Sequence, residues 1–168
     1  MEEQKMGVRR RYCRPRKEQH RYPREATEPE DLFTQQRMAR ITKVRPAAND
    51  ATILIAEDHL DSREALSALL EAFGYCVLRA VNGLEAVDLA LERRPDLILM
   101  DIMMPELDGF EATRRIRGRE ETRHIPIITL TAMDGARSLA LDAGANDFLP
   151  KPINSGVLLN KVRSWLDE

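Results

Sequence analysis

LILMDIMMPELDG, from Leu97 to Gly109, is the stretch that decides the fold. Its first four residues are apolar without interruption, which is typical of a strand buried on both faces of a sheet. That strand ends on a carboxylate, Asp101, and no basic residue stands beside it in the sequence. An acid in this position is costly unless other charged groups meet it in the folded chain.

From residue 52 onward, strand-like apolar runs alternate with segments of helical periodicity. We expect strands at 52–56, 76–81, 97–100, 127–130 and 147–149, and helices at 62–73, 84–92, 108–117, 135–143 and 154–166. Strict alternation predicts a parallel sheet covered on both faces. The fold is therefore expected to be a doubly wound, flavodoxin-like α/β domain with five strands in the order 2-1-3-4-5 and five helices.

Helix ends and inward faces also follow from the pattern. Asp108 and Glu111 have the spacing of a helix start, and Gly74 is expected to stop the helix over 62–73. We expect Trp165 to pack the last helix on the sheet. The inward face of the helix over 62–73 is predicted to comprise Ala65, Leu66, Leu69, Leu70 and Phe73.

Acids converge at one edge of this predicted sheet. Ligands bind beyond the carboxyl ends of the strands, where the strand order reverses, which places Glu57 and Asp58 beside Asp101. Three carboxylates repel one another unless a cation lies among them, and hard oxygen donors in a partly open site suit Mg²⁺. Thr131 and Lys151 follow the fourth and fifth strands at the same edge. A metal, a lysine and a hydroxyl around a carboxylate are the groups expected for phosphoryl transfer.

Four ordered motifs then carry a family resemblance: ILIAEDH (53–59), LILMDIMMPELDG (97–109), PIITLTA (126–132) and GANDFLPKPI (144–153). Over about residues 52–167 the chain resembles the receiver domain of two-component response regulators. The resemblance implies that Asp101 is a phosphoacceptor for a histidine kinase or a histidine phosphotransfer protein.

The resemblance also implies roles for the residues around that aspartate. Asp58 would bind Mg²⁺ directly, Glu57 mostly through water, and Met103 through its backbone carbonyl, with Asp101 itself also among the metal ligands. Lys151, in a candidate cis peptide bond with Pro152, would pair with the phosphoryl group. Thr131 would turn to hydrogen-bond that group, and Phe148 would be the aromatic switch residue that follows it.

Departures from the family pattern also carry expectations. Glu57 stands where the family more often has Asp, and Thr131 and Lys151 are only 20 positions apart (151 − 131), a shortening around the helix over 135–143. Met103 and Met133 follow the phosphoacceptor and the threonine by two positions. Neither thioether can orient a hydrolytic water through a strong hydrogen bond, so a long-lived phospho-Asp101 is expected.

Several other residues suggest sites but have plainer interpretations. Met100, Met103, Met104 and Met133 lack neighbouring Cys or His, which favours packing over a soft-metal site. His59 is expected to face solvent as a loop residue. A cluster of cations at the end of the helix over 108–117 is expected to be solvated and to suit the helix dipole: Arg114, Arg115, Arg117 and Arg119.

The net charge of −2 conceals two unlike parts. Residues 1–50 contain 13 Lys+Arg and 8 Asp+Glu, a balance of +5, whereas residues 51–168 contain the remaining 13 and 20, a balance of −7. The composition changes near residues 46–50. We therefore expect an N-terminal extension (1–50) followed by the receiver-like domain (51–168).

The extension contains RRRYCRPRKEQHRYPR, residues 9–24, with eight cations and one acid. Its interleaved tyrosines could stack on bases while the cations bind phosphates, which makes nucleic acid an alternative partner. The simpler interpretation is a disordered tail, because this composition buries too little apolar surface to fold. A further hypothesis is that translation begins at Met38, so that residues 1–37 are not made.

Targeting features point to the cytoplasm. No apolar run approaches the roughly 20 residues of a membrane-spanning helix, and the N-terminus lacks the apolar core of a signal peptide. Cys13 and Cys76 are too few for a disulfide framework. We expect a cytoplasmic protein with reduced thiols and no membrane partner.

The leading function is a single-domain signalling switch, because the chain ends directly after the last expected helix. The enzymatic alternative is a phosphatase or mutase with an aspartyl nucleophile. Such enzymes carry a second Asp two positions after the nucleophile, and Met103 stands there. A non-enzymatic phosphoacceptor is therefore favoured, with the regulator tethered to nucleic acid through residues 9–24 as the other alternative.

Overall fold

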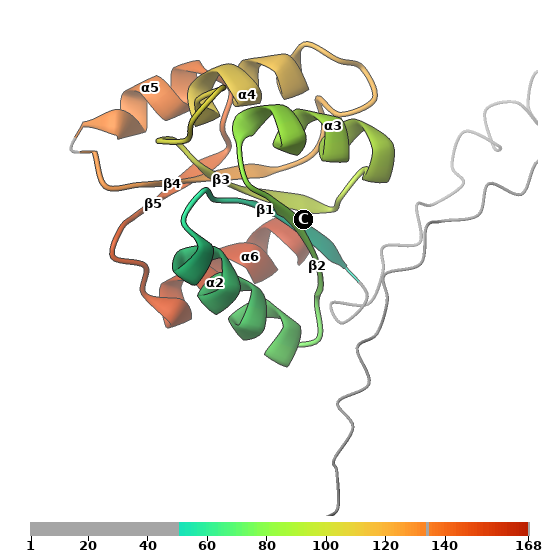
Figure 1. The fold of residues 1–168 in the computed structure, drawn as a ribbon. Helices are drawn as coiled ribbons and strands as arrows, with labels where there is room; N and C mark the ends of the chain where they lie inside the picture. The colour runs from blue at the N-terminus through green and yellow to red at the C-terminus, as the bar shows by residue number, and fades with distance from the viewer. Residues whose placement is uncertain (1–50, 134, 168) are drawn as a thin grey trace, which may run out of the picture. The chain divides into compact units, whose positions relative to one another are not determined.

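The computed structural model describes residues 51–133 and 135–167. The basic arm at 9–24, the alternative start at Met38 and the extension over 1–50 lie outside these residues. The strands are β1 (Thr52–Ala56), β2 (Cys76–Ala80), β3 (Leu97–Asp101), β4 (Ile127–Thr131) and β5 (Asp147–Pro150). The helices are α2 (Leu60–Ala72), α3 (Gly83–Arg93), α4 (Gly109–Arg117), α5 (Ala136–Asp142) and α6 (Ser155–Asp167) (Figure 1).

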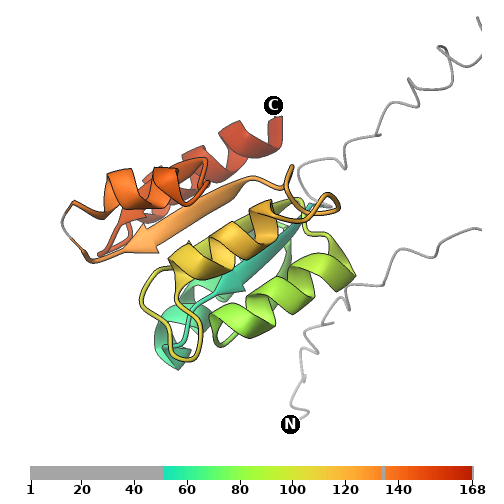
Figure 2. The ribbon, with the colours of Figure 1, turned by 90° about the horizontal axis from the view of Figure 1, so that it is seen from above.

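All strand pairs are parallel, and the order is β2-β1-β3-β4-β5, which confirms the predicted topology. Helices α2 and α6 cover one face of the sheet, and α3, α4 and α5 cover the other (Figures 1 and 2). Every residue of β3 is buried, as the uninterrupted apolar run predicts. All carboxyl ends of the strands therefore meet at one edge of the sheet, and all amino ends meet at the opposite edge.

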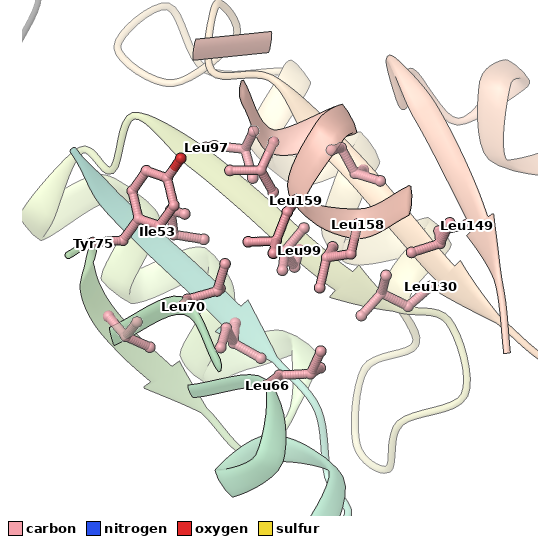
Figure 3. Packing of buried hydrophobic residues seen from close by; sticks show 14 of the residues in the cluster. Ile53, Leu66, Leu70, Tyr75, Leu97, Leu99, Leu130, Leu149, Leu158 and Leu159 are labelled. Carbon is pink, nitrogen blue, oxygen red and sulfur yellow. The ribbon is translucent and has the colours of Figure 1, made fainter. Parts of the chain in front are cut away.

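A hydrophobic cluster lies on each face. Under α2 and α6, leucines from both helices pack on β1 and β3, with Leu66, Leu70 and Leu158 among them (Figure 3). Trp165 packs against this cluster, as predicted. Under α3 and α4 the second cluster is built mainly from alanines, isoleucines and methionines. At about 25 cal/mol per Å² of apolar surface, these two clusters are the main stabilising contribution to the fold.

The helix ends confirm the capping prediction and correct several boundaries. The Asp108 carboxylate accepts the Glu111 backbone N–H at 2.9 Å, and Gly74 has a φ of 90° just beyond the end of α2. Asp101 and Pro150 belong to strands β3 and β5, which we expected to end one residue earlier. The other boundaries agree with the expected ones to within two residues.

The predicted inward face of α2 is partly wrong. Leu66 and Leu70 are buried and Leu69 packs against the core, but Ala65 is exposed and Phe73 is 44% exposed. The reason is the phase of the helix: α2 begins at Leu60, and its buried residues are Arg63, Leu66, Ser67 and Leu70. Two polar residues therefore lie on the inward face of this helix.

The arginine cluster at the end of α4 is corrected at one position. Arg114, Arg115 and Arg119 are exposed, as predicted. Arg117 instead donates hydrogen bonds to the carbonyl oxygens of Gly144 (2.7 Å), Arg123 (3.2 Å) and Ile125 (2.8 Å) and to Asn146 Oδ1 (2.6 Å). Burial lowers the pKa of this guanidinium. Arg117 thus ties α4 to two loops at the amino edge of the sheet.

No helix among the described residues is long and apolar enough to cross a membrane.

Candidate functional site

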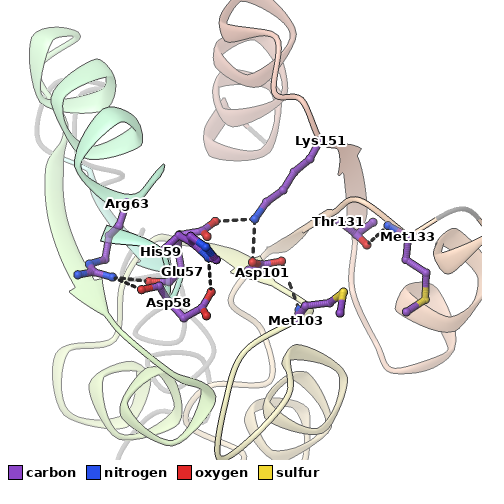
Figure 4. Close-up of polar contacts among 9 residues, drawn as sticks. All are labelled: Glu57, Asp58, His59, Arg63, Asp101, Met103, Thr131, Met133 and Lys151. Carbon is purple, nitrogen blue, oxygen red and sulfur yellow. Dashed lines mark hydrogen bonds and ion pairs between the residues drawn. The ribbon is translucent and has the colours of Figure 1, made fainter. Parts of the chain in front are cut away.

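The carboxyl edge of the sheet brings the predicted acids together around one lysine. Asp101 ends β3, Glu57 and Asp58 follow β1, and Lys151 follows β5. The Lys151 ammonium group donates to Glu57 Oε2 and to Asp101 Oδ2, each at 2.7 Å (Figure 4). The unpaired acid of the opening stretch therefore has a cationic partner 50 positions later in the chain. Such a doubly paired lysine offsets part of the repulsion between the carboxylates.

Glu57 is the most buried of these acids, with 1% of its surface exposed. Its Oε2 binds Lys151, whereas its Oε1 is buried and has no hydrogen-bond partner among the described residues. Burial and the neighbouring Asp101 charge raise the pKa of the Glu57 carboxyl, although Lys151 acts in the opposite direction. A buried carboxylate oxygen without a donor is a position where a cation would be favourable.

Asp58 and His59 continue the acidic loop toward solvent. The ligand atoms of Glu57, Asp58 and His59 lie within 4.8 Å of one another. The His59 side chain is 81% exposed, as predicted, and its Nδ1 lies 3.4 Å from Asp58 Oδ1. Because Mg²⁺ prefers oxygen ligands, the two carboxylates and not the imidazole fit that ion. The orphaned Glu57 oxygen and the oxygen donor set together fit a divalent cation.

The loop after Asp101 is tightly packed. The Met103 N–H donates to Asp101 Oδ1 at 3.3 Å, so the Met103 backbone lies directly beside the carboxylate. A Cβ atom at Gly109 would lie 2.0 Å from the Asp101 carbonyl oxygen, and one at Gly83 would lie 2.2 Å from the Leu107 carbonyl oxygen. Only glycine fits at these two close approaches, and they hold the loop against the start of α3 and α4.

The carboxylates of Asp101 and Glu57 keep the Lys151 side chain protonated. Burial alone would lower the pKa of its ammonium group, but the hydrogen bonds and charges of Asp101 and Glu57 raise the pKa above its usual value. The lysine is therefore cationic at neutral pH. Its peptide bond to Pro152 is cis, as the resemblance implies.

Two predicted residues lie apart from this ion-pair group. The Thr131 hydroxyl, at the end of β4, accepts the Met133 N–H at 2.9 Å (Figure 4). Phe148, on β5, is half-buried, and the Arg137 guanidinium of α5 lies 5.4 Å from its ring centroid. Among the described residues, neither side chain is hydrogen-bonded to Asp101, and their switching roles stay predictions.

One residue at this edge was missed by sequence reasoning. Arg63 of α2 is 9% exposed and donates from Nη1 to the carbonyl oxygens of Glu57 (2.7 Å) and Asp58 (3.1 Å). Its signal in the sequence is the helical spacing that it shares with Leu66 and Leu70. That spacing places Arg63 on the inward face, directly under the acidic loop.

Fold and site together define a doubly wound α/β domain whose topological switch point carries acids bridged by a lysine. The response regulator receiver domain family matches residues 53–163, and the chain belongs to this family. Receiver domains are signalling proteins of two-component systems, and they interact with histidine kinases or histidine phosphotransfer proteins.

Named relatives agree with this assignment. The chain is 40% identical over 119 residues to the polar-differentiation response regulator DivK of Brucella anthropi, covering 70% of this chain and 97% of that protein. It is 40% identical to the receiver domain of the Pseudomonas aeruginosa sensor histidine kinase PA1611, solved with a magnesium ion in its active-site cleft. That match has a TM-score of 0.67 and covers 71% of this chain and 99% of the other. The chemotaxis response regulator CheY4 of Vibrio cholerae is 31% identical, with a TM-score of 0.65, 68% of this chain and 98% of CheY4 being covered.

Proposed function

We propose that this protein is a phosphorylation-controlled switch that accepts a phosphoryl group on Asp101. The observation that carries the proposal is the bridge from Lys151 to both Asp101 Oδ2 and Glu57 Oε2 at the switch point of the sheet. We also propose that residues 51–168 form the receiver domain and that a histidine kinase or histidine phosphotransfer protein is the phosphoryl donor. The downstream target would be a partner protein that binds the phosphorylated and the unphosphorylated forms with different affinities.

The chemistry assigned to Asp101 is nucleophilic attack by its carboxylate. One Asp101 oxygen forms a bond to phosphorus while the bond from phosphorus to the donor imidazole nitrogen breaks, and the imidazole leaves with the electron pair. The product is an acyl phosphate. Rigid placement at the end of a fully buried strand holds the nucleophile in one orientation, which lowers the entropic cost of reaching the transition state.

Charge at this edge supports the transfer. Glu57, Asp58, Asp101 and the Met103 carbonyl would hold Mg²⁺, which when bound supplies positive charge to the phosphoryl oxygens. Lys151 is already 2.7 Å from the nucleophile and would contact the phosphoryl group as a point charge. Thr131 would exchange its bond to the Met133 N–H for one to the phosphoryl group, and Phe148 would follow. Differential contact with the phosphoryl group would thereby shift the population of the two states.

We propose that the protein is no turnover enzyme and catalyses only its own phosphorylation and dephosphorylation. The position two residues after Asp101 is Met103, whose side chain is 64% exposed and has no acid or base to offer a departing group. A phosphatase or mutase needs a proton donor there. The same residue therefore supports a switch over a catalyst.

The test is incubation of the full chain with acetyl phosphate or a phosphohistidine donor, with Mg²⁺ or with a chelator. We expect one added phosphate by intact mass, only with Mg²⁺, and its release by hydroxylamine, which cleaves acyl phosphates. A phosphate that resists hydroxylamine would contradict the assignment to an aspartate. Steady release of inorganic phosphate from phosphomonoesters would instead support the enzymatic alternative.

A further inference from the structure

Arg63 is a buried cation whose guanidinium binds backbone carbonyl oxygens and pairs with no carboxylate among residues 51–133 and 135–167. Its Nη1 donates to the carbonyl oxygens of Glu57 at 2.7 Å and Asp58 at 3.1 Å, as Figure 4 shows. A guanidinium group beside acidic side chains usually pairs with them, because an ion pair is the stronger interaction. Here its Nη1 instead fixes the main chain that carries the acids.

The segment from Glu57 to Asp58 is held from two sides. The Glu57 N–H donates to the Ala80 carbonyl oxygen of β2 at 3.1 Å, while its carbonyl oxygen accepts from Arg63. The Arg63 N–H donates to the His59 carbonyl oxygen at 3.0 Å, which joins the loop to the first turn of α2. With both sides bonded, the two side chains leave the backbone in fixed directions toward the carboxyl edge.

The backbone of this arginine belongs to a chain of polar contacts that runs from the core to the surface. The Ser67 hydroxyl, fully buried, donates to the Arg63 carbonyl oxygen at 2.7 Å. Arg79 of β2 donates from Nε to the Ser67 hydroxyl at 2.9 Å and from Nη2 to Glu71 at 2.8 Å. This chain connects α2 to β2 and holds the backbone from which the Arg63 side chain extends.

We infer that Arg63 is a positioning residue for the cation site, acting through the Glu57 and Asp58 carbonyl groups. The inference rests on the proposed function, since it assigns Arg63 a part in the affinity for Mg²⁺. Partners of this kind, which orient metal ligands without touching the metal, change affinity by about 10–100-fold when removed.

Charge and position predict opposite signs for this effect, which makes the inference testable. Removing a positive charge beside Glu57 and Asp58 would by Coulomb's law strengthen the binding of a cation. Removing the two hydrogen bonds that orient the acids would weaken it. Only a weaker affinity in a variant that lacks the Arg63 guanidinium is consistent with a positioning role.

The experiment is calorimetric titration of the metal-free full chain with MgCl₂, comparing wild type, Arg63→Gln, Arg63→Lys and Arg117→Gln. We expect Arg63→Gln to raise the dissociation constant for Mg²⁺ by about tenfold. Arg63→Lys keeps a hydrogen-bond donor but loses the planar guanidinium geometry, so we expect a dissociation constant between those of wild type and Arg63→Gln. Arg117→Gln removes an arginine that also binds carbonyl oxygens, at the other edge of the sheet, and should lower the melting temperature without changing the constant.

An unchanged or smaller dissociation constant for Arg63→Gln would overturn the inference while the proposed function stood. If that variant does not fold, Arg63→Lys decides the matter: at least about a twofold weaker constant supports the role, and an unchanged one overturns it. A wild-type chain that binds no Mg²⁺ would overturn the proposed function and, with it, this inference.

Discussion

At the carboxyl edge of the sheet, Glu57 and Asp101 share one lysine, and one oxygen of Glu57 has no donor among the described residues. At the amino edge, Asp147 alone receives the Lys161 ammonium group, the Phe148 N–H and the Trp165 indole N–H. The first edge therefore has more anionic charge than its own groups neutralise, and the second has its charge satisfied. A ligand cation would therefore be favourable at the first edge.

Two arginines that bind backbone carbonyl groups, one at each edge, extend this comparison. Arg117 binds the carbonyl groups of Gly144, Arg123 and Ile125, none of which carries an acidic side chain, so we assign it a structural role. Arg63 satisfies the carbonyl groups of two acids. The same interaction thus stabilises the fold at one edge and aims functional side chains at the other.

The largest expected effect is a loss of phosphorylation that occurs on substitution at one end of β3 and not at the other. Asp101→Asn should reduce Mg²⁺-dependent phosphorylation by at least about 100-fold, because an amide is not a nucleophile for this reaction. Asp96→Asn, at the amino end of β3, keeps an oxygen to accept the Thr52 N–H and should leave phosphorylation unchanged. Intact mass after incubation with acetyl phosphate measures both. Comparable phosphorylation of Asp101→Asn and wild type would contradict the assignment of Asp101 as the phosphoacceptor.

Arg117→Gln should show the reverse pattern, a loss of stability without a loss of chemistry. Three backbone carbonyl groups lose the Arg117 donor, and Asn146 Oδ1 keeps only the Ile127 N–H, so we expect the free energy of unfolding to fall by about 2–3 kcal/mol. Urea unfolding measures the stability, and the rate of phosphorylation below the transition measures the chemistry. A slower phosphorylation of the folded variant would show that the amino edge is coupled to the site.

The sequence predicts a residue's place in the fold or site best when the residues around it are of recognisable types, because residue type is what a sequence records. The strands were predictable because residues buried on both faces leave unbroken apolar runs, as in β1 and β3. The acids and Lys151 were predictable because parallel strands end at one edge. The contacts of Arg63 and Arg117 were not predictable, because each binds carbonyl oxygens, which every residue type carries; only the helical spacing of Arg63 indicated that it lies on an inward face.

Helix phase explains the remaining errors. The expected face of α2 followed the apolar residues Ala65, Leu69 and Phe73, whereas the observed face passes through Arg63 and Ser67. Sequence patterns weigh polar residues as outward, so a buried polar chain rotates the predicted face away from the true one. The roles of Thr131 and Phe148 came from the family resemblance and stay predictions.

A smaller effect concerns how long the carboxyl edge keeps its phosphoryl group. Met103 and Met133 are exposed near Asp101 and Thr131 and cannot orient water by strong hydrogen bonds. We expect Met103→Asn/Met133→Glu to lose phosphate faster than wild type by about one order of magnitude, equivalent to roughly 1.4 kcal/mol of barrier. Decay of the purified phosphoprotein with Mg²⁺ present is the measurement.

Leu139→Asn/Leu141→Glu provides the matched control, since these residues are exposed on α5 and are given the same polar side chains. The control should decay like wild type. Equal decay of all three proteins would mean that the methionines only fill space.

The smallest expected effect is a difference in the sign of pH dependence between the two edges. Burial would raise the pKa of Asp147, but the hydrogen bonds from Lys161, Phe148 and Trp165 together lower it. Its stabilisation is therefore present above the unfolded pKa of about 3.9 and is lost as pH falls through the folded value. Burial raises the pKa of Glu57, so its ionisation destabilises the metal-free fold increasingly as pH rises above about 4.3.

Urea unfolding of metal-free protein at several pH values tests this. Asp147→Asn should be less stable than wild type at neutral pH, by about 1 kcal/mol, with the gap closing in acid. Glu57→Gln should be more stable than wild type at neutral pH, with its gap also closing in acid. Shifts of the same sign for both variants at neutral pH would contradict the comparison.

Trp165 is the one tryptophan in the sequence, and its indole N–H points to Asp147 Oδ2 at 3.4 Å. The protein thus carries a built-in fluorophore, and it lies at the edge of the sheet opposite to Asp101. Ordinary quenching by a ligand at the acids would not reach it directly. A change in Trp165 fluorescence on phosphorylation would therefore report a structural change that extends from the carboxyl edge to the amino edge of the sheet.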